Sequence, residues 1–172
     1  MRCFIAIELP GDVKEKLKRI DFDEQTARVA KPSDYHLTLK FLGDVNESKL
    51  ERVKKELRKV RFKPFVLKLN KIGSFPKDKK FISVIWIGVT PKRKIVNLMK
   101  NVDDILVSLF DREKRFEPHI TLGRVKAVKN KNEFMKVFDL RVEERFKVNS
   151  IKLIKSELTE DGARYETLEE YS

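Results

Sequence analysis

HLTL at residues 36–39 and HITL at residues 119–122 are two copies of one pattern, and together they hold both histidines of the chain. In a β-strand, side chains two residues apart point to the same face, so each histidine shares a face with the threonine that follows it. The apolar residues between and after them face a core. Each of these HxTL segments therefore predicts half of a site, with one imidazole and one hydroxyl side by side on a buried strand.

Two such half-sites facing each other across one cleft would suit acid–base chemistry on an anion. An imidazole has an ordinary pKa of about 6.5, so one ring can accept a proton while the other donates one near neutral pH. Phosphodiester cleavage needs both steps, because a base activates water while an acid protonates the leaving oxygen on the opposite side of phosphorus. The threonine hydroxyls can donate to the other phosphoryl oxygens. We therefore expect a catalytic site that needs no metal ion.

Other interpretations of the histidines find less support. A strand histidine can simply donate to a backbone carbonyl, but this leaves the repeated setting of both histidines unexplained. Zinc ligation with Asp34, Asp44 or Glu117 is disfavoured, because none has H-x-x-E or C-x-x-C spacing. The chain has no G-x-S-x-G, P-loop or G-x-G-x-x-G motif. It therefore lacks the sequence signs of a serine hydrolase and of a dedicated nucleotide-binding loop.

The composition predicts a cytoplasmic protein with a sizeable core. The 172 residues are 41% hydrophobic, which suits one compact domain over 1–172 built from two interleaved lobes. There is no run of eighteen apolar residues, so no membrane span is expected. The first ten residues, MRCFIAIELP, predict a strand rather than a signal peptide. The single cysteine, Cys3, cannot form an internal disulfide.

The net charge of +12 favours a polyanionic partner such as nucleic acid. A charged fraction of 38% is also typical of hyperthermophile surfaces, but thermophily does not require an excess of one sign. Basic clusters on predicted helices, such as 54–63 and 92–94, are typical of solvated faces. The loop Lys77–Lys80 is the better candidate for contact with a phosphate backbone.

Strands are predicted wherever apolar residues alternate or form short runs between turn residues. The strand that starts at His36 ends at Gly43, and the last two strands form a hairpin that turns at Asp161-Gly162. The segments Lys31–Tyr35 and Asp111–Pro118 are loops, one before each histidine. The predicted strands are 2–9, 25–30, 36–42, 65–72, 81–89, the segment from 119, 146–158 and 163–168.

Helices are predicted where apolar residues recur at helical spacing. The first begins at its cap, Asp12, and the second begins near Ser48, which is spaced with Glu51 as a capping box. The third follows Thr90-Pro91, with a hydroxyl cap and a proline in the first turn. A short helix over 132–137 completes the set. The buried stripes are Val13, Leu17 and Ile20; Leu50, Val53, Leu57 and Val60; and Ile95, Leu98, Val102, Ile105 and Leu109.

The two HxTL segments lie 83 residues apart, which is close to half of the chain. Each follows a loop, begins a strand and lies in a strand–helix–strand setting, so the chain carries a weak internal repeat. We expect an α+β fold with two antiparallel-sheet lobes related by a pseudo-twofold axis, helices packed outside and a central cleft. One lobe is centred on 36–39 and the other on 119–122.

The paired HxTL segments resemble the defining motif of the two-histidine (2H) phosphoesterase superfamily. The chain looks most like the bacterial and archaeal RNA 2′,3′-cyclic phosphodiesterase branch, formerly called 2′-5′ RNA ligase. The similarity extends over nearly the whole chain. It includes MRCFIAIELP, HLTLKFLGDV, GSFPKDKKFISVIWIGV, RFEPHITLGRV and SELTEDGARYETL.

The resemblance implies a bilobal fold and metal-independent opening of a 2′,3′-cyclic phosphate to a 2′-phosphate. It implies that His36 is the proton donor to the leaving 3′ oxygen and that His119 is the proton acceptor that activates water. By the same resemblance, the phosphate would be bound by Thr38, Thr121 and Arg124, and Phe41 would stack on a base.

Strand alternation conflicts with two of these positions. It places Arg124 on the face opposite His119, and it aims Lys40 rather than Phe41 at the cleft. Arg124 can reach the phosphate only if its strand twists, bulges or ends early, and the same holds for Phe41.

The sequence thus predicts a metal-independent RNA 2′,3′-cyclic phosphodiesterase that uses no cofactor. We expect its partner to be RNA with a cyclic phosphate end, with tRNA as one candidate, and we expect a monomer that does not bind membranes. Two other functions stay open. One is a 2′-5′ RNA ligase that joins tRNA halves, and the other is a non-catalytic RNA-binding module.

Overall fold

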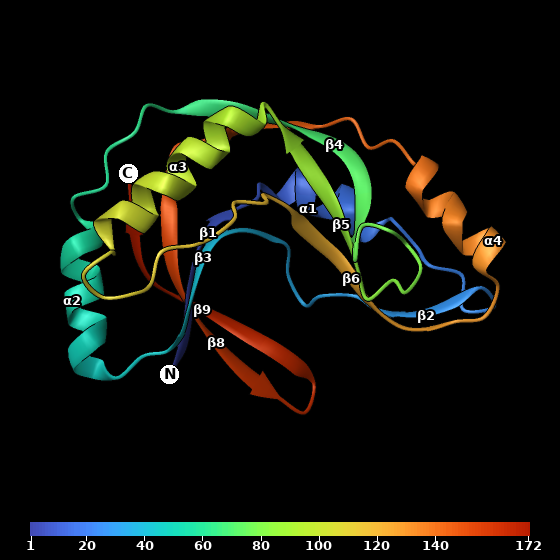
Figure 1. Ribbon diagram of the computed structural model, residues 1–172, viewed down its shortest axis with the longest axis horizontal. Coiled ribbons are helices and arrows are strands. Elements are labelled where there is room, and N and C mark those ends of the chain that lie inside the picture. Colours follow the sequence, from blue (N-terminus) through green and yellow to red (C-terminus); the bar gives the residue numbers. More distant parts are fainter.

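A computed structural model of the chain describes all 172 residues and has one curled antiparallel sheet with helices packed along it (Figure 1). This confirms the predicted α+β class. The strands are β1 Arg2–Glu8, β2 Ala27–Ala30, β3 His36–Asp44, β4 Phe65–Phe75, β5 Val84–Thr90, β6 Ile120–Val128, β7 Arg145–Val148, β8 Ile151–Thr159 and β9 Gly162–Tyr171. The α-helices are α1 Gly11–Lys18, α2 Glu47–Leu57, α3 Lys92–Ile105 and α4 Lys131–Phe134, the last followed by a 3₁₀ turn, Met135–Asp139.

The strand order is β7-β4-β5-β6-β3-β1-β8-β9, with β2 paired to β6. The two strands that carry the HxTL segments, β3 and β6, are neighbours, but they share only one backbone pair, Leu37 with Ile120. One group of strands therefore lies on the β3 side of this pair and another lies on the β6 side. Figure 1 shows α2 and α3 along one part of the sheet, α4 at the far end, and the β8–β9 hairpin projecting from the body.

The predicted apolar stripes of the helices form much of the core. Leu50, Val53 and Leu57 of α2 are buried, and so are Ile95, Leu98 and Val102 of α3. Burial of one such side chain contributes about 1.5–3 kcal/mol. The helices are therefore held mainly by packing on the sheet, which fixes the strand faces that carry the histidines.

The predicted cap of α2 is wrong. The helix begins at Glu47, and its cap is Asn46, whose side chain accepts a 2.8 Å hydrogen bond from the backbone N–H of Lys49. Asparagine caps at least as well as serine, so the earlier residue starts the helix and Ser48 lies inside its first turn.

The predicted caps of α1 and α3 are also wrong. Pro10 occupies the cap position of α1, and Asp12 lies in the first turn. Pro91 occupies the cap position of α3, and no side chain caps that helix. The hydroxyl-bearing Thr90 is instead the last residue of β5, where it pairs with Lys68. Its backbone therefore belongs to the sheet and not to the helix start.

The predicted strand over 65–72 is longer in the structure, because β4 continues through Gly73 to Phe75. A side chain at Gly73 would collide with the indole of Trp86, because a Cβ there would lie 2.5 Å from ring atoms. The glycine therefore permits close packing between neighbouring strands. The next strand, β5, starts at Val84 rather than at residue 81.

The C-terminal hairpin is confirmed in part, since β8 and β9 pair from Ile151–Tyr171 to Thr159–Gly162. The predicted single strand over 146–158 is wrong, because its first part is β7, which pairs with β4 at the other edge of the sheet. Gly162 has a φ of 111°, a conformation that favours glycine. None of the helices is both long enough and apolar enough to cross a lipid bilayer.

Candidate active site

The pair Leu37–Ile120 sets the register between the two HxTL segments. In a pair of antiparallel strands, the residue before a paired residue lies opposite the residue that follows its partner. Both of these side chains point to the sheet face opposite that of the central pair. His36 therefore faces Thr121, and Thr38 faces His119. The arrangement is a local twofold about the central pair, and it places the two imidazoles diagonally across the strands. Leu37 and Ile120 themselves are fully buried on the other face.

A β-bulge in β3 reverses the alternation just after the first HxTL pattern. Ala6 of β1 pairs with Thr38 and Ile5 pairs with Lys40, so Leu39 is an extra residue without a partner. Phe41 consequently shares the face of Thr38. It is 69% exposed, whereas Lys40 is only 4% exposed. The expectation that Lys40 faces the cleft is therefore wrong.

A matching bulge lies in β6. Trp86 of β5 pairs with Thr121 and Ile85 pairs with Gly123, so Leu122 is the extra residue. Arg124 is thereby brought to the face of Thr121 and is exposed there. The conflict between alternation and the position of Arg124 is resolved by this bulge. The fourth residue of each HxTL segment is thus the bulged one.

A cleft of about 620 Å³ lies over these strands. Its lining includes five of the six residues singled out from the sequence, namely His36, Thr38, Phe41, Thr121 and Arg124. His119 does not line this cavity, although Thr38, which faces it in the register, does.

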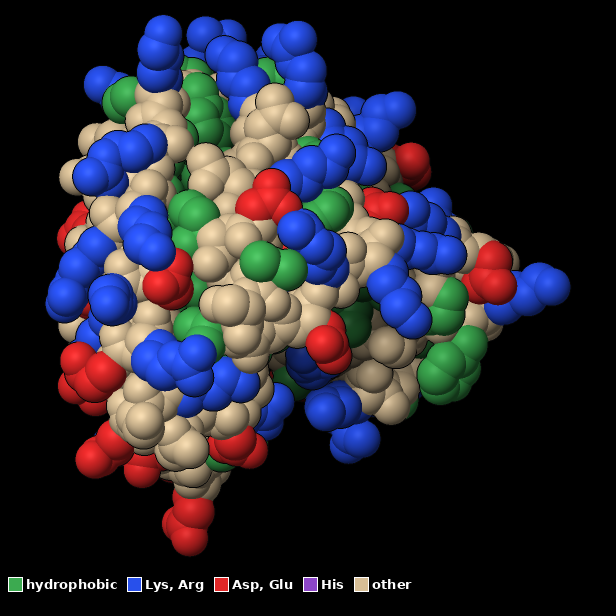
Figure 2. Space-filling view, turned by 60° about the vertical axis from the view of Figure 1, so that its left-hand side comes forward, with side chains coloured by type: hydrophobic (Ala, Val, Ile, Leu, Met, Phe, Trp, Pro, Cys, Tyr) green, Lys and Arg blue, Asp and Glu red, His purple; other side chains and the backbone are tan.

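Charge in the cleft favours an anion. The charged residues of the lining are Arg2, Lys31, Asp34, Arg124 and Lys126. Four cations therefore surround a single carboxylate, and focusing of their field within a cleft raises the local concentration of anionic ligands. Figure 2 shows the face on the α2 side of the molecule, where Lys and Arg side chains are spread among acidic ones and neither histidine is visible. The positive charge that can act on an anion in the site is therefore that of the four cations lining the cleft.

The His36 ring is held among two aromatic rings and one carboxylate. Phe4 and Tyr165 contact it edge-on, with ring centroids at 5.6 and 4.9 Å. Its Nε2 lies 3.3 Å from Oδ2 of Asp34, which is itself paired with Lys14 at 3.0 Å. Burial lowers the pKa of His36 below its ordinary value, while the Asp34 carboxylate acts in the opposite direction.

The His119 ring has a different anchor. Its Nδ1 lies 2.7 Å from the backbone carbonyl of Glu117. A carbonyl oxygen only accepts, so Nδ1 carries the hydrogen and Nε2 of the neutral ring keeps a free lone pair. The ring also packs edge-on against Phe75, with centroids 5.1 Å apart. The Glu117 side chain turns away to Lys77, whose hydrogen bond lowers the pKa of the carboxyl group.

Lys40 links β3, the strand of His36, to the loop that precedes His119. Its ammonium group donates to Asp103 of α3 at 2.7 Å and to Glu113 at 3.1 Å. Asp103 also accepts from the backbone N–H of Glu113. The side chains of Lys40 and Asp103 are 2% and 5% exposed, so this is a buried ion pair. It fixes Lys40 on the helix side of the sheet and thereby supports the bulge at Leu39.

Three features of the site are not predicted from the sequence. Asp34 stands two residues before His36, a spacing that could have suggested a partner for the ring rather than a zinc ligand. Tyr165 comes from the distant C-terminal hairpin, and no local signal connects it to His36. The bulge in β6 had a signal, because an isolated glycine within a strand, Gly123, is typical of a bulge.

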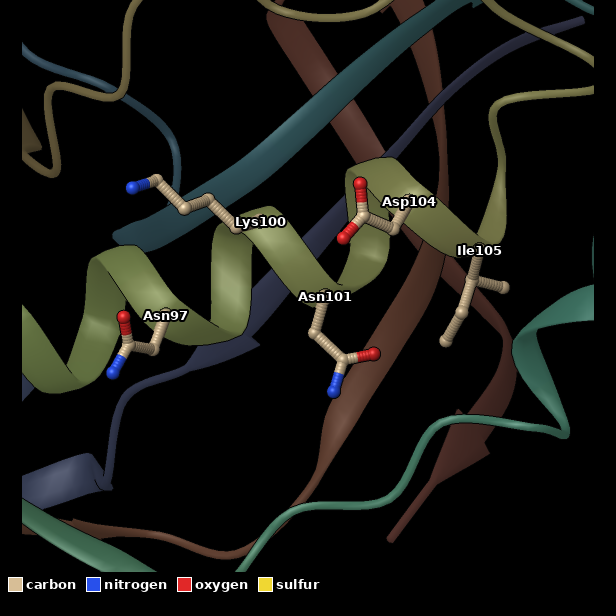
Figure 3. A pocket seen from close by; sticks show the side chains of 5 residues that line it. All are labelled: Asn97, Lys100, Asn101, Asp104 and Ile105. Atoms are coloured by element: carbon tan, nitrogen blue, oxygen red, sulfur yellow. The ribbon is translucent and has the colours of Figure 1, made fainter.

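The hollow on the outer side of α3 is of a different kind (Figure 3). Its lining comes from one helix and consists of Asn97, Lys100, Asn101, Asp104 and Ile105. Asp104 is paired with Arg112, and Asn101 donates to the backbone carbonyl of Arg61. Asp104 and Asn101 therefore already have partners, and the five labelled side chains point in different directions, so the hollow offers no converging set of groups. Nowhere in the structure do three His, Cys, Asp or Glu side chains cluster as metal ligands would.

Comparison with a family model gives two consecutive matches. The model, described as LigT-like phosphoesterase, matches residues 7–86 and again residues 87–165. Each match contains one HxTL segment. The internal repeat inferred from the two segments therefore coincides with a repeat of the family pattern.

Similar proteins are known from archaea and bacteria. A protein of Methanocaldococcus jannaschii named RNA 2′,3′-cyclic phosphodiesterase is 35% identical over 178 residues, covering 99% of this chain and 100% of its own. One of the same name from Archaeoglobus fulgidus is 33% identical over 174 residues, covering 98% of each chain. A solved structure from Thermus thermophilus superimposes with a TM-score of 0.78 at 26% identity, covering 100% of this chain and 97% of that one.

Proposed function

Since the chain belongs to the family of LigT-like phosphoesterases, we propose that it hydrolyses the 2′,3′-cyclic phosphate ends of RNA to 2′-phosphates. The names of its relatives from M. jannaschii and A. fulgidus support this substrate. The observation that carries the proposal is the Leu37–Ile120 register. It sets each histidine opposite the threonine of the other segment, so that both imidazoles and both hydroxyls lie on the same face of one strand pair.

In the proposed reaction, water attacks phosphorus in line with the leaving 3′ oxygen. Nε2 of His119 accepts the proton from this water, because the Glu117 carbonyl keeps the hydrogen of the neutral ring on Nδ1. His36 donates its proton to the 3′ oxygen as the bond between phosphorus and that oxygen breaks. The product carries a 2′-phosphate and a 3′-hydroxyl, and proton exchange with solvent returns both histidines to their starting states.

The remaining site residues bind the substrate in this proposal. Thr38 and Thr121 donate to the phosphoryl oxygens that do not leave, and Arg124 supplies the positive charge that a metal ion would otherwise provide. Phe41, which projects into the cleft after the bulge, offers its ring to the terminal base. The protein acts as a monomer, and its partner is the 3′ end of an RNA.

The test is an assay of an oligoribonucleotide that ends in a 2′,3′-cyclic phosphate, with EDTA present. We expect conversion to the 2′-phosphate at a rate unchanged by EDTA. A 3′-phosphate product has a free 2′-hydroxyl, and a 2′-phosphate product does not. An enzyme that requires a free 2′-hydroxyl therefore acts on the 3′-phosphate product and leaves the 2′-phosphate product intact. Undiminished turnover in a His36→Ala/His119→Ala double variant would refute the proposal.

The same reaction separates ligation from hydrolysis. When a second RNA with a 5′-hydroxyl end is included, gel analysis resolves the joined product from the hydrolysed one. Ligated RNA as the dominant product would make hydrolysis the side reaction. Binding without any turnover would leave only an RNA-binding module.

A further inference from the structure

A second groove, of about 260 Å³, lies beside the cleft on the surface formed by the loop before β5 and the end of β6. We call it the Phe81 groove. Phe81 is 78% exposed, which makes it more exposed than Phe41 in the cleft. A phenyl ring so far out of the core contributes little to folding. With Ile82, Val125 and Val128 it forms an apolar lining rimmed by lysines, and contiguous apolar patches rimmed by polar residues mark binding sites.

Lysines surround this ring. The groove is lined by Lys79, Lys80, Lys126 and Lys131, and no carboxylate lines it. Lys79 is placed over the ring of Phe138, but Lys80, Lys126 and Lys131 form no ion pair. The closest acidic residue in the loop, Asp78, accepts a hydrogen bond from the backbone N–H of Lys80. Three free cations beside an exposed ring match a chain of phosphates and bases.

The groove adjoins the cleft. Lys126 lines both, and it lies on β6 only two residues beyond Arg124. From Thr121 to Val128 the strand spans roughly 23 Å, at about 3.3 Å per residue. A single nucleotide in the cleft therefore cannot reach across the groove, whereas a longer strand can.

The other end of the cleft has mixed charge. There the β8–β9 hairpin supplies Leu158 and Tyr165 to the lining. The tip of the hairpin carries four acidic residues, Glu157, Glu160, Asp161 and Glu166, against one arginine, Arg164. Arg2, which pairs with Ser156 of β8, offsets part of this negative charge. The carboxylates at the hairpin tip still favour an RNA path toward Lys126, where the groove has no carboxylate.

We propose that the Phe81 groove binds the single-stranded nucleotides that precede the cyclic phosphate end of the substrate. A base stacks on Phe81, while Lys80, Lys126 and Lys131 contact the phosphates between it and the cleft. This rests on the proposed function for the identity of the end. It makes an unpaired 3′ tail of several nucleotides the preferred substrate, over a cyclic mononucleotide or a blunt duplex end.

The test compares two substrates that share the same terminal nucleoside. One is the nucleoside 2′,3′-cyclic monophosphate, and the other is an oligoribonucleotide of about eight residues ending in the same cyclic phosphate. The variants are Phe81→Ser and the double variant Lys80→Gln/Lys131→Gln. Lys126 is left unchanged because it also lines the cleft.

We expect Phe81→Ser to raise KM for the oligonucleotide about tenfold, in line with the loss of one stacked base, with kcat unchanged. The double lysine variant reduces the salt dependence of kcat/KM for the oligonucleotide by about 1.4 in logarithmic slope, from two lost phosphate contacts. Kinetics with the cyclic mononucleotide stay unchanged in both. The matched controls are Val107→Ser, an exposed apolar residue just after α3 that lines neither the cleft nor the groove, and Lys55→Gln/Lys63→Gln.

An oligonucleotide KM that is unaltered in Phe81→Ser, or an equal change for both substrates, overturns the groove as a binding site. A higher kcat/KM of the unaltered protein for the mononucleotide than for the oligonucleotide also overturns it. If the unaltered protein hydrolyses neither substrate, the proposed function fails. The groove is then judged alone, by fluorescence anisotropy with an oligonucleotide carrying a terminal phosphate, where Phe81→Ser must weaken binding about tenfold.

Discussion

The two HxTL segments share a backbone but have different surroundings. Both run into a bulge at their fourth residue, and each histidine faces the threonine of the other segment. Yet His36 has a carboxylate, Asp34, at its Nε2, whereas His119 has a carbonyl at its Nδ1. A carboxylate favours the protonated ring, and a carbonyl at Nδ1 leaves Nε2 as an acceptor. The repeated pattern thus gives one ring whose proton is held by a carboxylate against the larger effect of burial, and one ring whose Nε2 is free to accept a proton.

The residue after each bulge shows the same divergence. After Leu39 comes Lys40, which is held by a buried ion pair with Asp103. After Leu122 comes Gly123, which is covered so closely by β2 that a Cβ would lie 2.4 Å from a methyl group of Val29. One bulge is fixed by charge and the other by close backbone packing.

The largest effect is expected from removing either imidazole. His36→Ala and His119→Ala should each lower kcat by about 10²-fold or more, in line with general acid–base contributions. The roles separate with a substrate whose 3′ oxygen is replaced by sulfur, because a thiolate leaves without a proton. On this substrate His36→Ala should regain most of its rate, and His119→Ala should not.

The control for this comparison is the unaltered protein on both substrates, which corrects for the intrinsic reactivity of the sulfur compound. Recovery of both variants to the same extent would contradict the division into acid and base. Recovery of His119→Ala alone would exchange the two roles.

The next effect concerns stability on the β3 side. Lys40→Met leaves the buried carboxylate of Asp103 without its main partner, so the free energy of unfolding should fall by about 3–5 kcal/mol. Chemical denaturation measures it. The double variant Lys40→Met/Asp103→Leu should recover most of the loss, because replacing both charges removes the unpaired one.

On the β6 side, Gly123→Ala should cost about 1–3 kcal/mol, because the added methyl group overlaps Val29 and displaces β2. Gly11→Ala is the matched control, since nothing lies within 4 Å of a Cβ there, and it should leave stability nearly unchanged. If the two alanine variants unfold at the same denaturant concentration, the close packing of β2 on Gly123 is not what supports this bulge.

The sequence predicted which segments form strands and helices better than it predicted which way their side chains point. Strands, helix stripes and the α+β class follow from apolar periodicity, because the periods of 2 and 3.6 residues are properties of the local chain. The faces of Lys40 and Phe41 do not follow from it. They depend on one extra residue in β3, and that residue is supported by an ion pair to a helix more than sixty positions away. Periodicity carries no information about such a distant partner.

The environment of the catalytic candidates was hidden for the same reason. Tyr165 reaches His36 only because β9 pairs with β8, and β8 in turn pairs with β1, which is the neighbour of β3. The sequence names both residues but not this path between them. By contrast, the convergence of the two HxTL segments was predictable, because two identical polar patterns that use every histidine of a chain have few explanations apart from a shared site.

The smallest expected effect tests the role of Asp34 directly through pH. Burial lowers the pKa of His36, and Asp34 opposes this. In Asp34→Asn the opposing carboxylate is lost while the ammonium of Lys14 remains, so the pKa of His36 should fall further. At low pH His36 is protonated in both proteins, and kcat/KM should agree. As pH rises, His36 loses its proton at a lower pH in the variant than in the unaltered protein. The ratio of variant to unaltered kcat/KM should therefore fall, and it should level off once His36 is deprotonated in both proteins. Glu15→Gln, which removes an exposed carboxylate paired with Lys18 away from the cleft, is the charge-matched control. A loss of kcat/KM that is the same at every pH would mean that Asp34 positions the His36 ring without changing its pKa. The two histidines would then differ in how their rings are held and not in how readily they are protonated.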